Sequence, residues 1–80
     1  MNNDNYAIPP EVIKLTKDKN CTIYRAWRMH KRISLYALAK RMQIPIDLLT
    51  KIENGKYEPT FRLLLDFATA LSIMPELIDL

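Results

Sequence analysis

The stretch SLYALAKRMQIPIDLLTKIEN, residues 34–54, decides the fold of this 80-residue chain. Its first half carries one apolar stripe at helical spacing, at positions i, i+3, i+4 and i+7: Leu35, Leu38, Ala39 and Met42. Such a stripe makes one side of a helix apolar, and Ser34 is a good N-cap for it. The pattern predicts a helix over residues 35–42 that packs on one side.

The second half of the stretch predicts a turn and another helix. Pro45 disfavours helical backbone at the residue before it, which places a turn at residues 43–44. A helix over 45–54 follows, with an inward face made of Leu48, Leu49 and Ile52. Gly55, the only glycine, comes directly after it, where a left-handed residue closes a helix. Two short helices across a tight turn are the sequence form of a helix-turn-helix.

The flanking sequence predicts helices as well. A short helix opens at Pro9–Pro10 with Val12, Ile13 and Leu15 on its apolar side, Thr22 caps a helix over 23–31, Thr60 caps one over 61–71, and Pro75 opens a last turn through Leu80. The inward faces are expected to be Ile23, Ala26, Trp27 and His30 in one helix, and Phe61, Leu64, Leu65, Ala68 and Leu71 in another. The predicted fold class is therefore all-α. We expect a compact five-helix domain over residues 21–80, preceded by an arm and short helix over 1–20.

Composition excludes several function classes. One cysteine and one histidine, Cys21 and His30, cannot assemble a zinc site or a disulfide framework, and nothing near them completes a catalytic triad. We therefore expect no metal, no cofactor and no enzymatic activity. No apolar run approaches the roughly 20 residues of a membrane span, and no signal peptide is evident, so we expect a soluble cytoplasmic protein.

Charge is distributed unevenly along the chain. The net charge is +3, yet basic residues crowd the segment 25–62, while the segment after Arg62 carries only acidic charges. A basic middle beside an acidic end favours a face directed toward an anion such as nucleic acid.

The stretch 34–73 resembles the Cro and lambda-repressor family, also called XRE-type. The matching residues are Ser34, Leu38-Ala39, Leu49, Ile52-Glu53, Gly55-Lys56, Pro59-Thr60, Leu64-Leu65 and Ala68-Ala70-Leu71. The preceding segment is similar to the N-terminal extension of XRE-type antitoxins from toxin–antitoxin pairs, on Ile8-Pro9, Glu11-Val12 and Arg25-Ala26-Trp27-Arg28. The resemblance implies a lambda-repressor-like fold and binding of double-stranded DNA.

The resemblance also implies which residues face DNA. The groove-facing positions of the recognition helix are Ile46, Asp47, Thr50 and Lys51, and the candidates for phosphate contacts are Ser34, Leu35, Asn54, Lys56, Tyr57, Thr60 and Arg62. The sequence departs from the family pattern at several of these positions, where Gln, Arg and Ser are usual. Two roles are open for Asp47: it accepts a hydrogen bond from cytosine, or it only stabilises the N-terminus of its helix. A carboxylate beside core Ile52 needs a partner, and the resemblance places Arg28 at the matching family position, so a structural ion pair is expected between Arg28 and Glu53.

Two functions remain open at this point. The first is a sequence-specific transcriptional repressor, a homodimer on a palindromic operator, with the further option of an antitoxin that represses its own operon and binds a toxin. The alternative is a protein-interaction module whose helix-turn-helix no longer reads DNA, which Leu35, Ile46 and Asp47 favour. The dimer face is also open, since Leu77, Ile78 and Leu80 would either close the core or pair two subunits.

Overall fold

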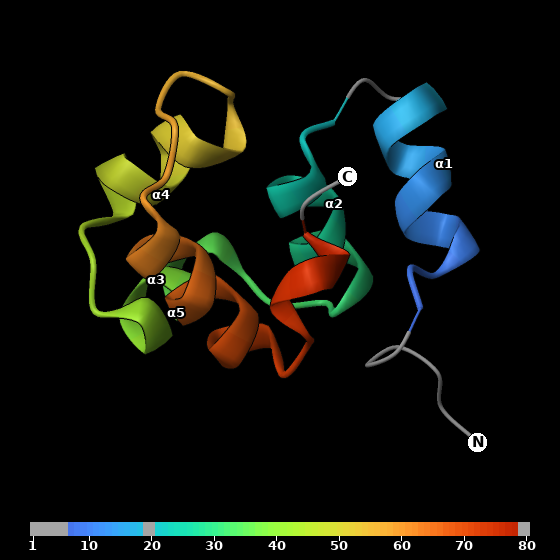
Figure 1. Ribbon diagram of the computed structural model, residues 1–80. Coiled ribbons are helices and arrows are strands. Elements are labelled where there is room, and N and C mark those ends of the chain that lie inside the picture. Colours follow the sequence, from blue (N-terminus) through green and yellow to red (C-terminus); the bar gives the residue numbers. More distant parts are fainter. Residues whose placement is uncertain (1–6, 19–20, 79–80) are drawn as a thin grey trace.

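The computed structural model describes residues 7–18 and 21–78, and over these ranges all of the regular structure is helical (Figure 1). The elements are α1 (Pro10–Asp18), α2 (Ile23–His30), α3 (Leu35–Met42), α4 (Ile46–Glu53), α5 (Phe61–Leu71) and a 3-10 turn, η1 (Pro75–Leu77). The all-α, five-helix fold class predicted from the sequence is confirmed. In Figure 1, α1 lies beside α2 at one end of the molecule and α4 lies at the other.

Three helices begin with a hydroxyl cap. The side-chain oxygens of Thr22, Ser34 and Thr60 accept hydrogen bonds from the backbone N–H three residues on, at 3.2, 3.0 and 3.2 Å. Each cap satisfies one of the amides that a helix leaves without a partner in its first turn. The start of α4 differs: its N-cap is Pro45, which offers no side-chain hydrogen bond, and Asp47 supplies a negative charge in the first turn.

Within residues 7–18 and 21–78, four helices end in the same way, at a residue with left-handed backbone. These residues are Arg32, Gln43, Gly55 and Ser72, with φ of 57°, 58°, 74° and 58°. After each, the next amide donates back to the carbonyl five residues earlier, as in Ile44 to Ala39 at 3.1 Å and Lys56 to Lys51 at 2.8 Å. The positive φ expected of Gly55 is confirmed. The residue after the left-handed one is an isoleucine at three of the four ends, and each isoleucine packs on the core.

The core is centred on Trp27 and Phe67, with Leu38, Leu49, Val12 and Ile78 also fully buried. Trp27 Nε1 donates to the carbonyl oxygen of Leu77 at 3.0 Å, which fastens η1 to α2. The carboxyl end therefore closes the core through Ile78, one of the two roles left open by the sequence. Leu80 lies outside the described residues.

Three inward-facing predictions need correction. Phe61 is 73 % exposed, and Phe67 is buried instead. The two are six residues apart, about 240° around a helix, so they cannot share one face. Ile13 is exposed although its neighbour Val12 is buried, because adjacent residues are about 100° apart around a helix. His30, the last residue of α2, is only half-buried, and its Nδ1 is 2.7 Å from Oε1 of Glu11 on α1.

Candidate nucleic-acid interface

A helix-turn-helix forms from α3 and α4, joined by the three residues 43–45. Gln43 closes α3 in the left-handed conformation, and Ile44 turns inward against the core. Ala39, nearly completely buried, provides a small side chain on the packed face of α3. Leu49 and Ile52 are buried on the inner face of α4, so the opposite face is turned outward.

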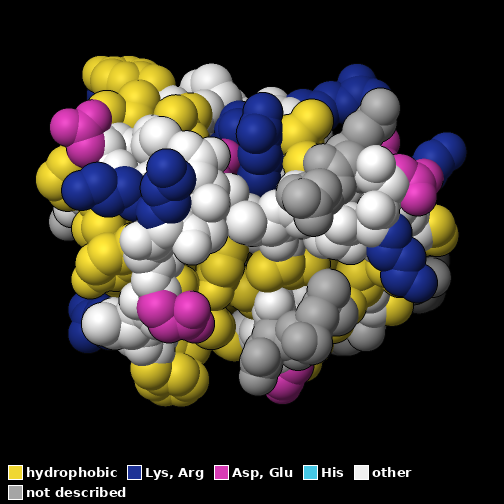
Figure 2. Space-filling model, turned by 90° about the horizontal axis from the view of Figure 1, so that it is seen from above, with side chains coloured by type: hydrophobic (Ala, Val, Ile, Leu, Met, Phe, Trp, Pro, Cys, Tyr) yellow, Lys and Arg dark blue, Asp and Glu magenta, His cyan; other side chains and the backbone are white. Residues whose placement is uncertain are grey.

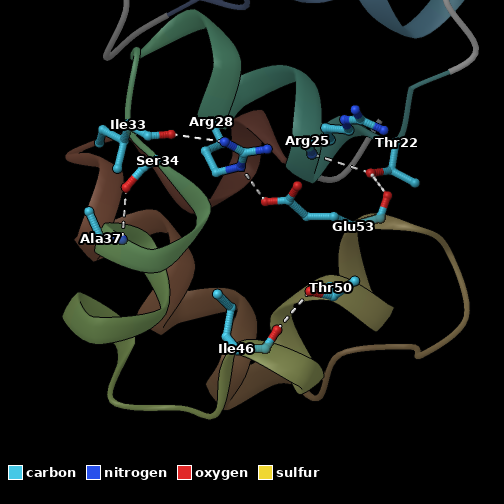
Figure 3. Close-up of polar contacts among 9 residues, drawn as sticks. All are labelled: Thr22, Arg25, Arg28, Ile33, Ser34, Ala37, Ile46, Thr50 and Glu53. Atoms are coloured by element: carbon cyan, nitrogen blue, oxygen red, sulfur yellow. Dashed lines mark hydrogen bonds and ion pairs between the residues drawn. The ribbon is translucent and has the colours of Figure 1, made fainter.

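The outer face of α4 carries the predicted base-reading residues. Ile46 is 40 % exposed, and the side chains of Asp47 and Lys51 are exposed as well. Thr50 is half-buried, and its hydroxyl donates to the carbonyl oxygen of Ile46 at 2.9 Å (Figure 3). The hydroxyl hydrogen of Thr50 is thus used within the helix, which leaves its oxygen as an acceptor.

The first turn of α3 holds two of the predicted phosphate residues. Ser34 caps the helix, as Figure 3 shows, with its oxygen accepting from Ala37 N–H. Leu35 is half-buried and packs against the core, so it offers only its backbone N–H to a ligand. Beside them Tyr36 is 68 % exposed, and sequence reasoning did not single it out. Its position in the first turn of α3, where a helix leaves amides without partners inside the helix, was the available signal.

The loop between α4 and α5 brings together Asn54, Lys56 and Tyr57, all exposed. At the ends of α2, α3 and α5 the residue in the place of Lys56 is an isoleucine that packs on the core; here it is a cation in solvent. The side-chain oxygen of Thr60 accepts a hydrogen bond from Leu63 N–H and so caps α5.

Arg62, the second residue of α5, has an exposed side chain. Its Nε is 3.4 Å from Asp66 Oδ1, and it lines a hollow of about 290 Å³ with Arg41 and Gln43 at the end of α3. The sequence analysis grouped Arg62 with this loop, and the hollow that Arg62 lines contains none of Asn54, Lys56 and Tyr57.

Arg28 and Glu53 form an ion pair behind the recognition helix (Figure 3). Arg28 Nε lies 2.7 Å from Glu53 Oε2, and its Nη1 donates to the carbonyl oxygen of Ile33 at 3.0 Å. Glu53 is only 5 % exposed. The hydroxyl of Thr22 donates to the carbonyl oxygen of Glu53 at 2.7 Å while accepting from Arg25 N–H. The carboxyl end of α4 is thus tied to the first turn of α2.

A second hollow, of about 190 Å³, lies between α2, α3 and α4. It is lined by the Arg28–Glu53 pair together with Arg25, Leu35, Thr50 and Asn54. Arg25 is an exposed cation that sequence reasoning did not include among the site residues. The sequence could have indicated Arg25 by its position three residues, about one helical turn, before Arg28, which puts both arginines on one face of the helix.

Figure 2 views the end of the molecule that carries the α4–α5 loop and the start of α2. Lys and Arg side chains are spread across this face, with fewer Asp and Glu among them. Among residues 7–18 and 21–78, no cluster of three or more His, Cys, Asp or Glu side chains could hold a metal ion. Within the same ranges, none of the helices has the length and apolar character needed to cross a membrane.

A tight α3–turn–α4 unit with an anchored inner face and an exposed outer face defines the DNA-binding helix-turn-helix class. A family model described as helix-turn-helix matches residues 25–77. The chain belongs to this family, the XRE-type helix-turn-helix proteins, which are DNA-binding regulators rather than enzymes. Comparison with curated proteins and with solved structures gave no match.

Proposed function

We propose that this DNA-binding regulator is a sequence-specific repressor that acts as a homodimer on a palindromic operator. The observation that carries the proposal is the division of α4 into two faces. Leu49, Ile52 and Glu53 hold the inner face in place, while Ile46, Asp47 and Lys51 are exposed together on the outer face. A helix held in this way enters the major groove with its outer side chains against base edges.

The chemistry of that face suggests what each side chain reads. Ile46 offers an apolar contact to a thymine methyl group, and Lys51 donates to guanine O6 or N7. Asp47 either accepts from cytosine N4 or only stabilises the uncapped N-terminus of α4. Lys56 and Tyr57, with Ser34 and the first-turn amides of α3, supply contacts to phosphates on either side of the groove.

An antitoxin role is a further part of this proposal, and it rests on the resemblance of residues 8–28 to antitoxin extensions. The placement of α1 supports it, since α1 and α4 lie at opposite ends of the molecule (Figure 1). A partner protein held on α1 would leave the outer face of α4 open to DNA. Co-purification with the product of an adjacent gene tests this role, and a regulator of this kind acts in the cytoplasm.

The test of DNA reading is a fluorescence-anisotropy titration of DNA from upstream of the protein's own gene against a scrambled duplex. Lys51→Ala should weaken binding to the upstream DNA by about tenfold, a loss of about 1.4 kcal/mol, and leave the scrambled duplex nearly unaffected. The matched control is Lys17→Ala, an exposed lysine on α1, which should change neither affinity.

Asp47→Asn separates the two readings of that residue. If Asp47 accepts from cytosine, affinity for the upstream DNA alone should fall by about 1–3 kcal/mol. If it serves only the helix terminus, binding to both duplexes should tighten, because a charge that repels phosphate is removed.

Equal binding of both duplexes by the unmodified protein would overturn sequence-specific repression. No binding to either duplex would favour the interaction module, which the exposed Ile46 and the acidic Asp47 on the outer face of α4 otherwise support.

A further inference from the structure

Three side chains on the outer face of α4 are open to a ligand. Ile46 is 40 % exposed, whereas Ile52, on the inner face of the same helix, is 2 % exposed. Asp47 and Lys51 are four residues apart, a spacing at which opposite charges commonly pair on a helix. Among residues 7–18 and 21–78, however, neither of these two side chains makes a hydrogen bond or an ion pair. The face therefore presents an apolar group, an acceptor and a donor.

The major-groove edges of base pairs differ in the order of such groups. Thymine carries a methyl group at C5, but the group next to that methyl is O4, an acceptor. Cytosine carries an amino group at C4, which is a donor, but it has no methyl group at C5. A cytosine methylated at C5 places a methyl group directly beside a donor, and its guanine partner continues the edge with two acceptors, O6 and N7.

We propose that the outer face of α4 reads 5-methylcytosine paired with guanine, so that cytosine methylation strengthens the binding of this regulator to its operator. This inference rests on the DNA-reading function proposed above and goes beyond it in naming a modified base. Ile46 contacts the C5 methyl group, Asp47 accepts from N4–H of the same base, and Lys51 donates to O6 or N7 of the paired guanine. The apolar group, the acceptor and the donor follow one another along α4 in the order of the groups on the base pair.

The carboxylate of Asp47 distinguishes 5-methylcytosine from thymine as the base that meets Ile46. Thymine would offer Ile46 the same methyl group, but its O4 would then face the carboxylate, and two acceptors in contact leave both without a hydrogen bond. An ordinary cytosine satisfies Asp47 and leaves Ile46 without a methyl group to contact. Burial of one methyl group corresponds to a gain in affinity of about fourfold.

The test compares three versions of the DNA upstream of the protein's own gene, in a fluorescence-anisotropy titration with the full chain. They are amplified with ordinary nucleotides, with 5-methyl-dCTP in place of dCTP, or with dUTP in place of dTTP. The methylated duplex should bind about fourfold more tightly than the ordinary one. The uracil duplex, which lacks the methyl groups of thymine, should bind as the ordinary one does.

Two outcomes of this comparison would overturn the proposal. One is a methylated duplex that binds no more tightly than the ordinary duplex. The other is a uracil duplex that binds more weakly while methylation has no effect, because thymine would then be the base that Ile46 contacts. A scrambled duplex amplified with 5-methyl-dCTP controls for any general effect of methylation and should bind as its ordinary counterpart does.

Ile46→Ala tests which side chain contacts the methyl group. The readout is the ratio of the affinities for the methylated and ordinary duplexes, and this variant should abolish the difference between them. The matched control is Ile13→Ala, since Ile13 is an isoleucine of similar exposure, 38 %, on α1 at the opposite end of the molecule from α4 (Figure 1). The control should keep the ratio of the unmodified protein. An unchanged ratio in Ile46→Ala would refute the assignment of Ile46.

A scan of single bases tests the part of Asp47. Each cytosine of the bound region is replaced in turn by 5-methylcytosine or by thymine. At one position in each half-site 5-methylcytosine should strengthen binding, and thymine should weaken it by about tenfold, since O4 then faces the carboxylate. Asp47→Asn should remove most of the penalty for thymine, because an amide can donate to O4. Stronger binding with both bases at that position would show that the methyl group alone is read and would overturn the proposal.

The same titrations separate this proposal from the proposed function. A preference for the ordinary upstream DNA over the scrambled duplex, with no effect of methylation, would leave the repressor standing and refute the reading of 5-methylcytosine. Equal binding of the upstream and scrambled duplexes in both their ordinary and methylated forms would refute both.

Discussion

At Gly55 the backbone is left-handed, with φ of +74°, and the space around the residue is open. A Cβ there would have Thr22 Cγ2 as its nearest neighbour, at an ordinary 3.8 Å. Any cost of a side chain at this position therefore comes from backbone conformation and not from a clash. This makes Gly55 a clean site for measuring that cost.

Gly55→Ala should lower the free energy of unfolding by about 1 kcal/mol, because L-residues are disfavoured in the left-handed region. Urea unfolding followed by circular dichroism measures the change. Gly55→Asn should cost less, since asparagine tolerates this conformation better. Equal stability of the alanine variant and the unmodified protein would refute the conformational account.

Arg28 and Glu53 provide the second test at the scale of single residues. Arg28→Met leaves a carboxylate that is 5 % exposed without its partner, and should destabilise the protein by about 3 kcal/mol. The double variant with Glu53→Met should recover part of that loss, because no buried charge remains. Chemical denaturation of the single and double variants gives the comparison, and a double variant worse than Arg28→Met would contradict it.

At the scale of elements, the ends of α2, α3 and α5 share one device, a left-handed residue followed by an isoleucine. Arg32, Gln43 and Ser72 adopt this conformation without being glycine, at a cost that glycine avoids. The isoleucines that follow them, at 33, 44 and 73, pack on the core and compensate for the cost. Tertiary packing thus overrides local preference at three turns.

Gln43→Gly should raise the free energy of unfolding by about 0.5–1 kcal/mol, since it relieves the left-handed strain between α3 and α4. The matched control is Lys40→Gly, one turn earlier in α3, where helical backbone makes glycine unfavourable by about 1 kcal/mol. In a domain of this size each kcal/mol shifts Tm by about 4–8 °C, so a thermal melt resolves the opposite signs. A melting temperature lowered by Gln43→Gly would show that the strain is absent.

The helices could be predicted from the sequence because the residues that begin and end a helix lie within it or directly beside it. Hydroxyl caps at Thr22, Ser34 and Thr60, and the single glycine after α4, mark helix ends without any knowledge of tertiary contacts. The face of α5 was less predictable. Apolar residues lie on more than one side of its first two turns, at Phe61, Leu63, Leu64, Leu65 and Phe67, so periodicity could not tell that Phe67 is buried and Phe61 is exposed.

The candidate site was predictable to a similar degree. The outer positions of α4 were expected from the resemblance to the Cro and lambda-repressor family. The need of a buried carboxylate for a partner predicted a cation near Glu53, and the resemblance named Arg28 as that cation. The place of Arg62 in a hollow with Arg41 and Gln43 did not follow, because it depends on how α5 packs against α3. Arg25 was missed for a related reason: its place beside Asn54 exists only once α2 and α4 are packed together.

At the scale of the whole molecule, the modest net charge of +3 limits long-range attraction to DNA, so individual phosphate contacts should be visible in the salt dependence. Lys56→Ala should reduce the slope of log affinity against log salt concentration by about one. Lys17→Ala, on α1 at the opposite end of the molecule, should leave the slope unaltered. Affinity that stays constant between about 50 and 200 mM salt would rule out phosphate contacts as the main source of binding.

The two faces of α4 also make this domain a suitable scaffold for changing which DNA sequence is bound. The residues that anchor α4 and those that meet DNA occupy separate positions, so Ile46, Asp47 and Lys51 can be exchanged as a set while Leu49, Ile52 and Glu53 stay. A chain with the outer residues of another family member should keep its stability and acquire that member's operator preference. Divergence within such a lineage would then proceed by changes at a few outward positions, with the folded body inherited intact.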